Sequence, residues 1–301
     1  MKEMKRKNIF TPTLIILCVI LALYTVVLIA PLLWALYTSF MDVGKYSLGL
    51  DFFEELSYAL SFDNFTIDNF VLMLTEFKIR PHTPGSKDAY LVHMFINSFL
   101  YAGGCGIIAT IVPCVMAYLV ARYNYWFGKI VYGIVLITMA IPIVGALPSE
   151  MRMVANIGLE DSLLGLFVLK ANFLGIYFLV FHAQFKSIPM DYTEAAELDG
   201  ASDWYVMSRI ILPISSGTIV TVILLNFIAF WNDYQVPMMY WPSRPVLAYG
   251  LFRITEDHTG GKGTTPLNVA AMMMVAIPLL LLFAAFNKKI MSNMSIGGVK
   301  G

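Results

Sequence analysis

Six apolar segments, each long enough to cross a membrane, constrain the fold of this chain more than any other feature. A helix of about 20 apolar residues spans the roughly 30 Å hydrocarbon core of a bilayer. Only 13% of the chain is charged, whereas ordinary soluble domains carry about 25%. The sequence therefore predicts an all-α membrane protein, one transmembrane domain over residues 1–301 with six helices. The expected spans are residues 14–40, 92–121, 129–149, 162–184, 214–236 and 267–286.

The basic start of the chain, MKEMKRK (1–7), sets the expected orientation of these spans. The apolar run that follows is too long for a signal peptide and lacks an early small-residue cleavage site, so we expect a retained first span. Lysine and arginine concentrate on the cytoplasmic side of membrane proteins. Six spans put both termini on one side of the membrane, and this bias favours the cytoplasm for that side. The expected cytoplasmic segments are then 1–13, 122–128, 185–213 and 287–301.

Two long segments are expected on the outer side. Residues 41–91 alternate apolar residues with charges, and we expect one or two short helices lying on the membrane surface. Residues 237–266 hold Gly/Pro clusters in WPSRP and HTGGKGTTP, which favour a loop rather than a helix.

The longest polar interruption in the C-terminal half is SIPMDYTEAAELDGASDWYVMSRIILPISS, residues 187–216. Asp191 and Glu194 lie where acidic residues favour the start of a helix. Gly200 is expected to stop or bend that helix, and Ser202 can cap a second one. Small residues around the bend would allow another surface to approach closely. This pattern indicates a docking element on the cytoplasmic side.

Other chemical motifs are weak. The segment GGKGTT around Lys262 lacks the spacing of a phosphate-binding loop, so we expect no nucleotide site in this chain. The four histidines form no HExxH pattern, and the three cysteines form no CxxC pair, so no metal or other cofactor is expected. A formal net charge of zero argues against a nucleic-acid partner.

Polar residues within the spans mark a candidate substrate pathway, because polar groups are costly in hydrocarbon. The cluster FWNDYQ (230–235) combines aromatic rings with amide and carboxylate groups, a combination suited to binding sugars. An aromatic belt at the membrane interface is the alternative. Lys170 either extends to the outer interface or faces a polar cavity. The candidate pathway residues are Asn97, Asn226, Trp231, Asn232 and Asp233.

The docking element resembles a known family motif: Glu-Ala-Ala, three residues, Gly, nine residues, then Ile-x-Leu-Pro. The chain has Glu194-Ala195-Ala196, Gly200 and IILP at 210–213, so every defined position matches. This motif is typical of permease subunits of bacterial ABC importers. Asn97-Ser98, DGA at 199–201, FWNDYQVP at 230–237 and GGVKG at 297–301 resemble the carbohydrate branch, in particular its maltose-type second permease.

The resemblance implies a type I ABC importer permease fold in a bacterial cytoplasmic membrane, with a coupling helix in 185–213. It further implies a second permease subunit, two ATPase subunits, an extracytoplasmic solute-binding protein and a sugar substrate. A permease for another solute, such as a polyamine or glycerol phosphate, is an alternative; an ion-coupled secondary transporter or a membrane enzyme is a more distant one. The residues implied in ATPase docking are Glu194, Ala195, Ala196, Asp199, Gly200, Gly297, Gly298 and Lys300.

Overall fold

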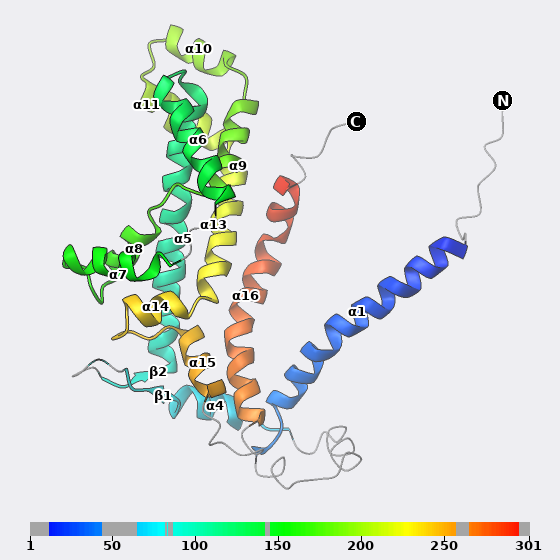
Figure 1. Ribbon diagram of the computed structural model, residues 1–301. Coiled ribbons are helices and arrows are strands. Elements are labelled where there is room, and N and C mark those ends of the chain that lie inside the picture. Colours follow the sequence, from blue (N-terminus) through cyan, green and yellow to red (C-terminus); the bar gives the residue numbers. More distant parts are fainter. Residues whose placement is uncertain are drawn as a thin grey trace, which may run out of the picture. The chain divides into compact units, whose positions relative to one another are not determined.

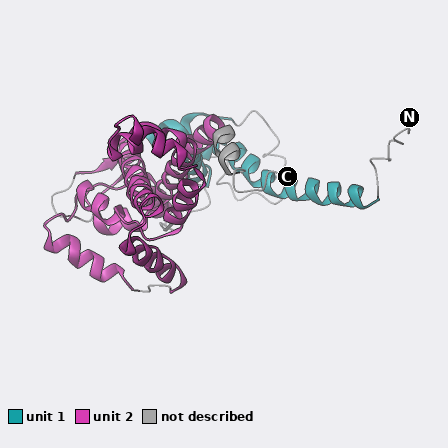
Figure 2. Cartoon of the chain, turned by 90° about the horizontal axis from the view of Figure 1, so that it is seen from above, with its two compact units in different colours: residues 1–75, 257–276 teal, residues 76–256, 277–301 magenta. Residues whose placement is uncertain are grey.

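The computed structural model describes residues 12–43, 65–81, 83, 87–141, 145–256 and 265–294 (Figure 1). The chain divides into two compact units, residues 1–75 with 257–276 and residues 76–256 with 277–301 (Figure 2). The predicted docking tail with Gly297, Gly298 and Lys300 lies outside the described residues, as does Lys262.

The first unit contains α1 (Pro12–Ser39) and α4 (Asp68–Thr75). The side-chain amide of Asn69 in α4 donates hydrogen bonds to the backbone oxygens of Ser39 (2.9 Å) and Met41 (2.7 Å), which ties α4 to the end of α1. None of the most apolar 18-residue window of α1 is buried. A helix that is apolar all round and exposed is suited to lipid. The helix α4 agrees with the short surface helix expected in 41–91.

The second unit is built around α5 (Leu91–Arg122), which packs along α13 (Ser216–Trp231) and α9 (Ile176–Ser187). Its sheet has two antiparallel strands, β1 (Lys78–Ile79) and β2 (Ala89–Tyr90). The helix α16 (Thr265–Met294) runs from the first unit into the second. The remaining helices are α6 (Trp126–Ala140), α7 (Leu147–Asn156), α8 (Leu163–Lys170), α10 (Asp191–Leu198), α11 (Asp203–Tyr205), the π-helix η2 (Val206–Ile211), α12 (Leu212–Ile214), α14 (Gln235–Tyr240) and α15 (Leu247–Glu256).

Aromatic rings of α9 lie at the centre of a buried apolar core. Phe178, Phe181 and Phe185 are fully buried among α5, α6 and η2. The ring of Phe185 meets that of Tyr118 edge-on at 5.6 Å. Burying each such ring contributes about 1.5–3 kcal/mol relative to exposure in water. This core joins the C-terminal end of α5 to the segment that follows α9.

Three of the expected spans are present as helices long and apolar enough to cross a membrane: α1, α5 and residues 265–286 of α16. A fourth requires counting residues 203–214 and 216–231 as one span, although the two parts are bent by 73°. The six predicted spans are therefore not all matched by continuous helices in the described residues.

The predicted spans 129–149 and 162–184 are interrupted. The helix α6 ends at Ala140, where Ile141 is extended; Pro142 follows in the sequence and disfavours helical geometry at the residue before it. Between α8 and α9, the side chain of Asn172 accepts a hydrogen bond from the backbone N–H of Leu174 (2.8 Å). Gly175 then has a φ of 152°, which favours glycine. These local turns override the apolar pattern.

The expected loop at 237–266 was wrong for residues 237–240, which lie in α14, and for residues 247–256, which form α15. Its first residues are held by α5: the backbone N–H of Leu247 donates to Ser98 Oγ at 2.7 Å, and Leu247 is 2% exposed. These contacts bridge residues far apart in the sequence. The cluster WPSRP precedes this helix, and most of HTGGKGTTP lies outside the described residues; neither gave a sign of the helix between them.

Substitution of Gly165 with alanine should destabilise the second unit. A Cβ atom at Gly165 would lie 2.3 Å from the backbone oxygen of Leu159, which cannot move without shifting the chain. Overpacking of this kind costs about 1–3 kcal/mol. We expect a lower midpoint of thermal unfolding in detergent. Gly103→Ala is the matched control, because no atom lies within 4 Å of its added methyl group, and equal unfolding midpoints would contradict the expected clash.

Candidate functional site

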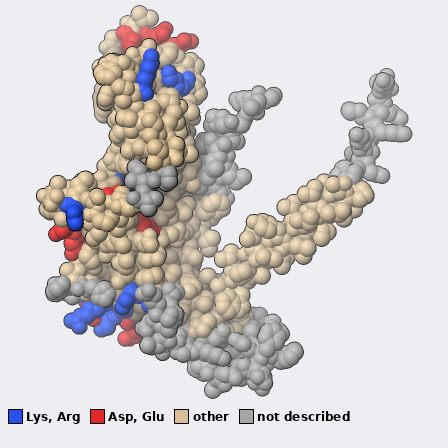
Figure 3. Space-filling view, viewed as in Figure 1, with Lys and Arg blue, Asp and Glu red and all other residues tan. Residues whose placement is uncertain are grey.

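The helix α10 has no buried residue: Thr193 and Ala196 are half-buried, and its other residues are exposed. Leu198, at its end, is 89% exposed, and Trp204 in the next helix is 72% exposed. Acidic side chains gather at this end of the second unit, beside lysine and arginine (Figure 3). Large exposed apolar residues next to charges are typical of a protein–protein interface. The exposed acidic residues of α10 and its C-terminal end are Asp191, Glu194, Glu197 and Asp199.

The bend after α10 has a defined geometry. Gly200 has a φ of +82°, its N–H donates to Glu197 O (3.0 Å), and Ala201 N–H donates to Ala196 O (2.9 Å). These two bonds form a Schellman motif, in which a glycine in the left-handed region closes a helix. The hydroxyl of Ser202 then caps α11 by accepting from Tyr205 N–H at 3.4 Å. The predicted pair of helices on either side of Gly200 is confirmed.

The C-terminal end of α5 holds this segment in place. Arg122 Nη1 lies 2.9 Å from the sulfur of Met190, just before α10. The pKa of Tyr123 is raised by burial, by the neighbouring Tyr118, and by a hydrogen bond with the carboxylate of Asp203. Asp203 therefore interacts with the residue that follows α5. Neither contact was predicted, because the partners are distant in the sequence.

Two of the predicted pathway residues join helices. The side-chain amide of Asn97 donates to the backbone oxygen of Pro245 at 3.0 Å, and the amide of Asn226 donates to Thr110 Oγ1 at 3.0 Å. Both asparagines are buried. Hydrogen bonds between membrane helices contribute about 0.6–1.7 kcal/mol each. These contacts connect α5 to α13 and to the start of α15.

Trp231 is 1% exposed, with its ring against Phe95 (5.6 Å between centroids) and Phe227 (5.5 Å). Asn232 is exposed, and its side chain donates to the backbone oxygen of Ile228 at 2.9 Å. The structure thus separates these two neighbours: the ring packs inside the unit, and the amide faces outward.

Asp233 lies in a polar cluster that includes residues not predicted as site residues. Its carboxylate accepts from the hydroxyl of Tyr101 at 2.7 Å and from Val236 N–H at 3.2 Å. The ring of Tyr101 packs on that of Phe230 (5.7 Å), and Lys170 Nζ lies 4.9 Å from the centre of the same ring. Lys170 is thus half-buried against an aromatic ring. Asn97 and Tyr101 are four residues apart and therefore lie on the same face of one helix. This spacing was the only feature of the sequence that could have indicated Tyr101 as a site residue.

Residues 109–292 match the family described as the binding-protein-dependent transport system inner membrane component. The match covers more than half of the chain. This chain belongs to that family. Its members are inner-membrane transport components rather than enzymes, which agrees with the apolar helices α1, α5 and α16.

Similar proteins include other permeases. The chain is 26% identical to the diacetylchitobiose uptake system permease protein NgcG of Streptomyces coelicolor, over 92% of this chain and 86% of that protein. It is also 26% identical to the melibiose/raffinose/stachyose import permease protein MelC of Bacillus subtilis (71% and 78%). The trehalose transport system permease protein SugB of Mycobacterium tuberculosis gives the same identity (69% and 78%).

The fold of this inner-membrane component is also found in a solved structure. A chain of a bacterial ABC transporter involved in the import of the acidic polysaccharide alginate aligns with a TM-score of 0.72, covering 94% of this chain and 99% of that one. The sequence identity is 19%, so this likeness shows the fold. The resemblance to the ABC importer permease fold is confirmed at that level.

Proposed function

We propose that this chain is a permease subunit of an ABC importer for a sugar or oligosaccharide. The main support for this function is the segment 191–203, in a chain that belongs to the family of binding-protein-dependent transport components. This segment presents a helix, the glycine that ends it and exposed apolar side chains to a partner. The permeases NgcG, MelC and SugB, named for the uptake of sugars, support the substrate class.

A second permease subunit completes the translocation pathway in this proposal, and a solute-binding protein delivers the sugar from outside. The chain acts as one transmembrane domain, residues 1–301, with both termini in the cytoplasm and 41–91 outside. The interrupted segments around α6 and α8–α9 complete six spans in the assembled transporter. Asn97, Asn226, Trp231, Asn232 and Asp233 remain the proposed pathway residues, with Asp233 and Asn232 the most accessible of them.

Two ATPase subunits dock on the cytoplasmic side, one of them on α10. In this proposal Glu194 pairs with a basic or polar group of the ATPase, and Ala195 and Ala196 allow close packing. Asp199 and Gly200 set the end of the helix. Closure of the ATPases on ATP moves α10, and the cavity changes its access as rigid parts move around a central site. The tail with Gly297, Gly298 and Lys300 reaches the same partner.

Glycerol phosphate is a second candidate substrate. The chain is 26% identical to the sn-glycerol-3-phosphate transport system permease protein UgpE of Salmonella, over 65% of this chain and 69% of that protein. A phosphate needs a cationic group in its path, and Lys170 is a half-buried cation over the ring of Phe230.

Uptake by the reconstituted transporter tests the function. Proteoliposomes containing this chain, the second permease, the ATPase and the binding protein are supplied with labelled disaccharides or labelled sn-glycerol-3-phosphate. We expect disaccharide uptake that requires ATP inside. Uptake of glycerol phosphate alone would favour the second candidate, and uptake driven by an ion gradient without ATP would overturn both.

Reversing the charge of Glu194 should disrupt docking of the ATPase. In Glu194→Lys we expect co-purification of the ATPase to fall at least about tenfold, because a buried interfacial charge would lose its partner. Glu160→Lys is the matched control: it makes the same change at an exposed position between α7 and α8. Normal ATPase binding by Glu194→Lys would contradict the proposed role of this carboxylate.

A further inference from the structure

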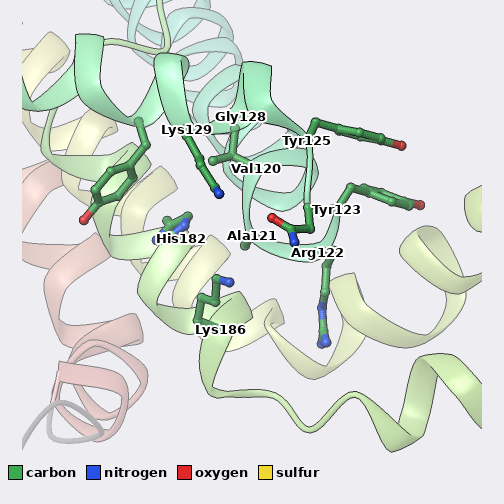
Figure 4. A pocket seen from close by; sticks show the side chains of 11 residues that line it. Val120, Ala121, Arg122, Tyr123, Tyr125, Gly128, Lys129, His182 and Lys186 are labelled. Atoms are coloured by element: carbon green, nitrogen blue, oxygen red, sulfur yellow. The ribbon is translucent and has the colours of Figure 1, made fainter.

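A basic pocket lies beside the segment proposed to dock the ATPase. A cavity of about 310 Å³ opens between the end of α5, the turn into α6 and the last turns of α9. Figure 4 shows Lys129, His182 and Lys186 directed toward its centre, with the rings of Tyr123 and Tyr125 stacked at one edge. Arg122 also contributes to the lining.

The positive charge of this pocket is not neutralised within the described part of the chain. No aspartate or glutamate lines it. The ion pairs among described residues join Asp88 to Lys78 (3.1 Å) and to Arg80 (4.0 Å), on another part of the unit. Lys129 and Lys186 point into the cavity, whereas the side chain of Arg122 extends away from them (Figure 4), and none of the three forms an ion pair with a carboxylate of the described residues.

Arg122 adds a second, independent observation. Its Nε and Nη2 atoms are buried and have no hydrogen-bond partner in the described structure. Its Nη1 contacts the sulfur of Met190, which is a weak acceptor. Buried donors without partners are costly, and an arginine in this state is suited to an anion that accepts two parallel hydrogen bonds. A phosphate group offers such oxygens.

Exposed aromatic residues indicate the depth of the pocket in the membrane. Tyr125, Trp126 and Phe127 follow directly after α5 and are 58%, 76% and 59% exposed. Tryptophan and tyrosine gather where a membrane protein crosses the headgroup region. An aromatic turn at that depth would bring the cations of the pocket to the level of the lipid phosphates. In the orientation proposed above, this is the cytoplasmic leaflet, whose anionic lipids attract basic residues.

We propose that this pocket binds the phosphate group of an anionic phospholipid. Lys129 and Lys186 contact the phosphate from α6 and α9, and the side-chain amide of Asn124 can donate to its oxygens. Arg122 lines the same cavity from the end of α5. The lipid bridges α5, α6 and α9 just below the segment that Arg122 holds through Met190, and it stabilises that segment in its docking position.

Native mass spectrometry of the full chain in detergent tests this site, with phosphatidylglycerol or phosphatidylcholine added. We expect preferential retention of phosphatidylglycerol. Lys129→Gln and Lys186→Gln should each lower this retention about fivefold, which is the effect of one basic residue near an anionic membrane surface. Both lysines are exposed, so neither change disturbs a core. Arg209→Gln, which removes one exposed charge from η2, is the matched control and should retain the lipid normally.

Millimolar inorganic phosphate distinguishes the two sources of a phosphate group. We expect it to leave phosphatidylglycerol bound, because the acyl chains and aromatic turn add contacts that a free ion lacks. Binding of inorganic phosphate by lipid-free protein, with no preference between the two lipids, would overturn the lipid assignment in favour of a free anion. Equal retention of both lipids, or unchanged retention in the two lysine variants, would overturn the site itself.

Discussion

Gly200→Pro should abolish transport while leaving the protein in the membrane. Proline fixes φ near −65°, whereas Gly200 requires +82°. The substitution also removes the N–H that donates to Glu197 O at 3.0 Å. Both bonds of the Schellman motif depend on this geometry, so α10 would lose its defined end and α11 its direction. We expect ATP-driven uptake to fall at least about tenfold, since the strain of a forbidden backbone conformation exceeds the 1.4 kcal/mol that a tenfold change represents.

Gly200→Asn is the control for this prediction. Asparagine tolerates the left-handed region better than other non-glycine residues and keeps the N–H. We therefore expect Gly200→Asn to retain most of the uptake. The amount of ATPase that co-purifies should likewise be high for the wild type and Gly200→Asn and low for Gly200→Pro. Wild-type transport and ATPase binding in Gly200→Pro would refute the assignment of α10 as the coupling element.

Leu198→Asp should weaken ATPase binding about 30-fold, the effect of losing a central apolar contact worth about 2 kcal/mol. Leu198 is 89% exposed in the isolated chain, which is a costly position for leucine unless a partner covers it. An aspartate there would place a charge in the covered centre of the interface. Binding of the purified ATPase to the permease in nanodiscs measures the effect directly.

Leu198→Met provides the comparison, because methionine keeps an apolar side chain of similar volume. We expect binding by Leu198→Met within about twofold of the wild type. If Leu198→Asp bound the ATPase as tightly as the methionine variant does, the end of α10 would lie outside the interface. Glu194 and the small residues before it would then have to carry the contact alone.

Long uninterrupted apolar runs were predicted well from the sequence. Residues 14–40 and 92–121 correspond to α1 and α5 within a few residues, because nothing in these runs competes with helix formation. The prolines at 31 and 113 lie inside these helices, as expected for membrane segments. Segments 129–149 and 162–184 differ, since α6 ends before an extended Ile141 and turns form at Asn172 and Gly175. A hydropathy average over the segment does not detect such local features.

In the candidate site, too, features set by neighbouring residues were predicted, whereas contacts between residues distant in the sequence were not. The bend at Gly200 and the cap at Ser202 follow from short-range chemistry and were predicted. The contacts of Arg122 with Met190, Tyr123 with Asp203, and Tyr101 with Asp233 join residues that are distant in the sequence. Such contacts depend on how α5 packs against the rest of the unit, which the residue pattern of α5 does not specify.

The unburied apolar surface of α1 has a consequence for insertion of the chain into the membrane. No residue in its most apolar window is buried by the chain itself, so its insertion depends on transfer into lipid and needs no tertiary partner. The segment can therefore enter the bilayer as soon as it leaves the ribosome, before α5 or any later helix has been synthesised. Its early placement would fix the orientation that every following segment must adopt.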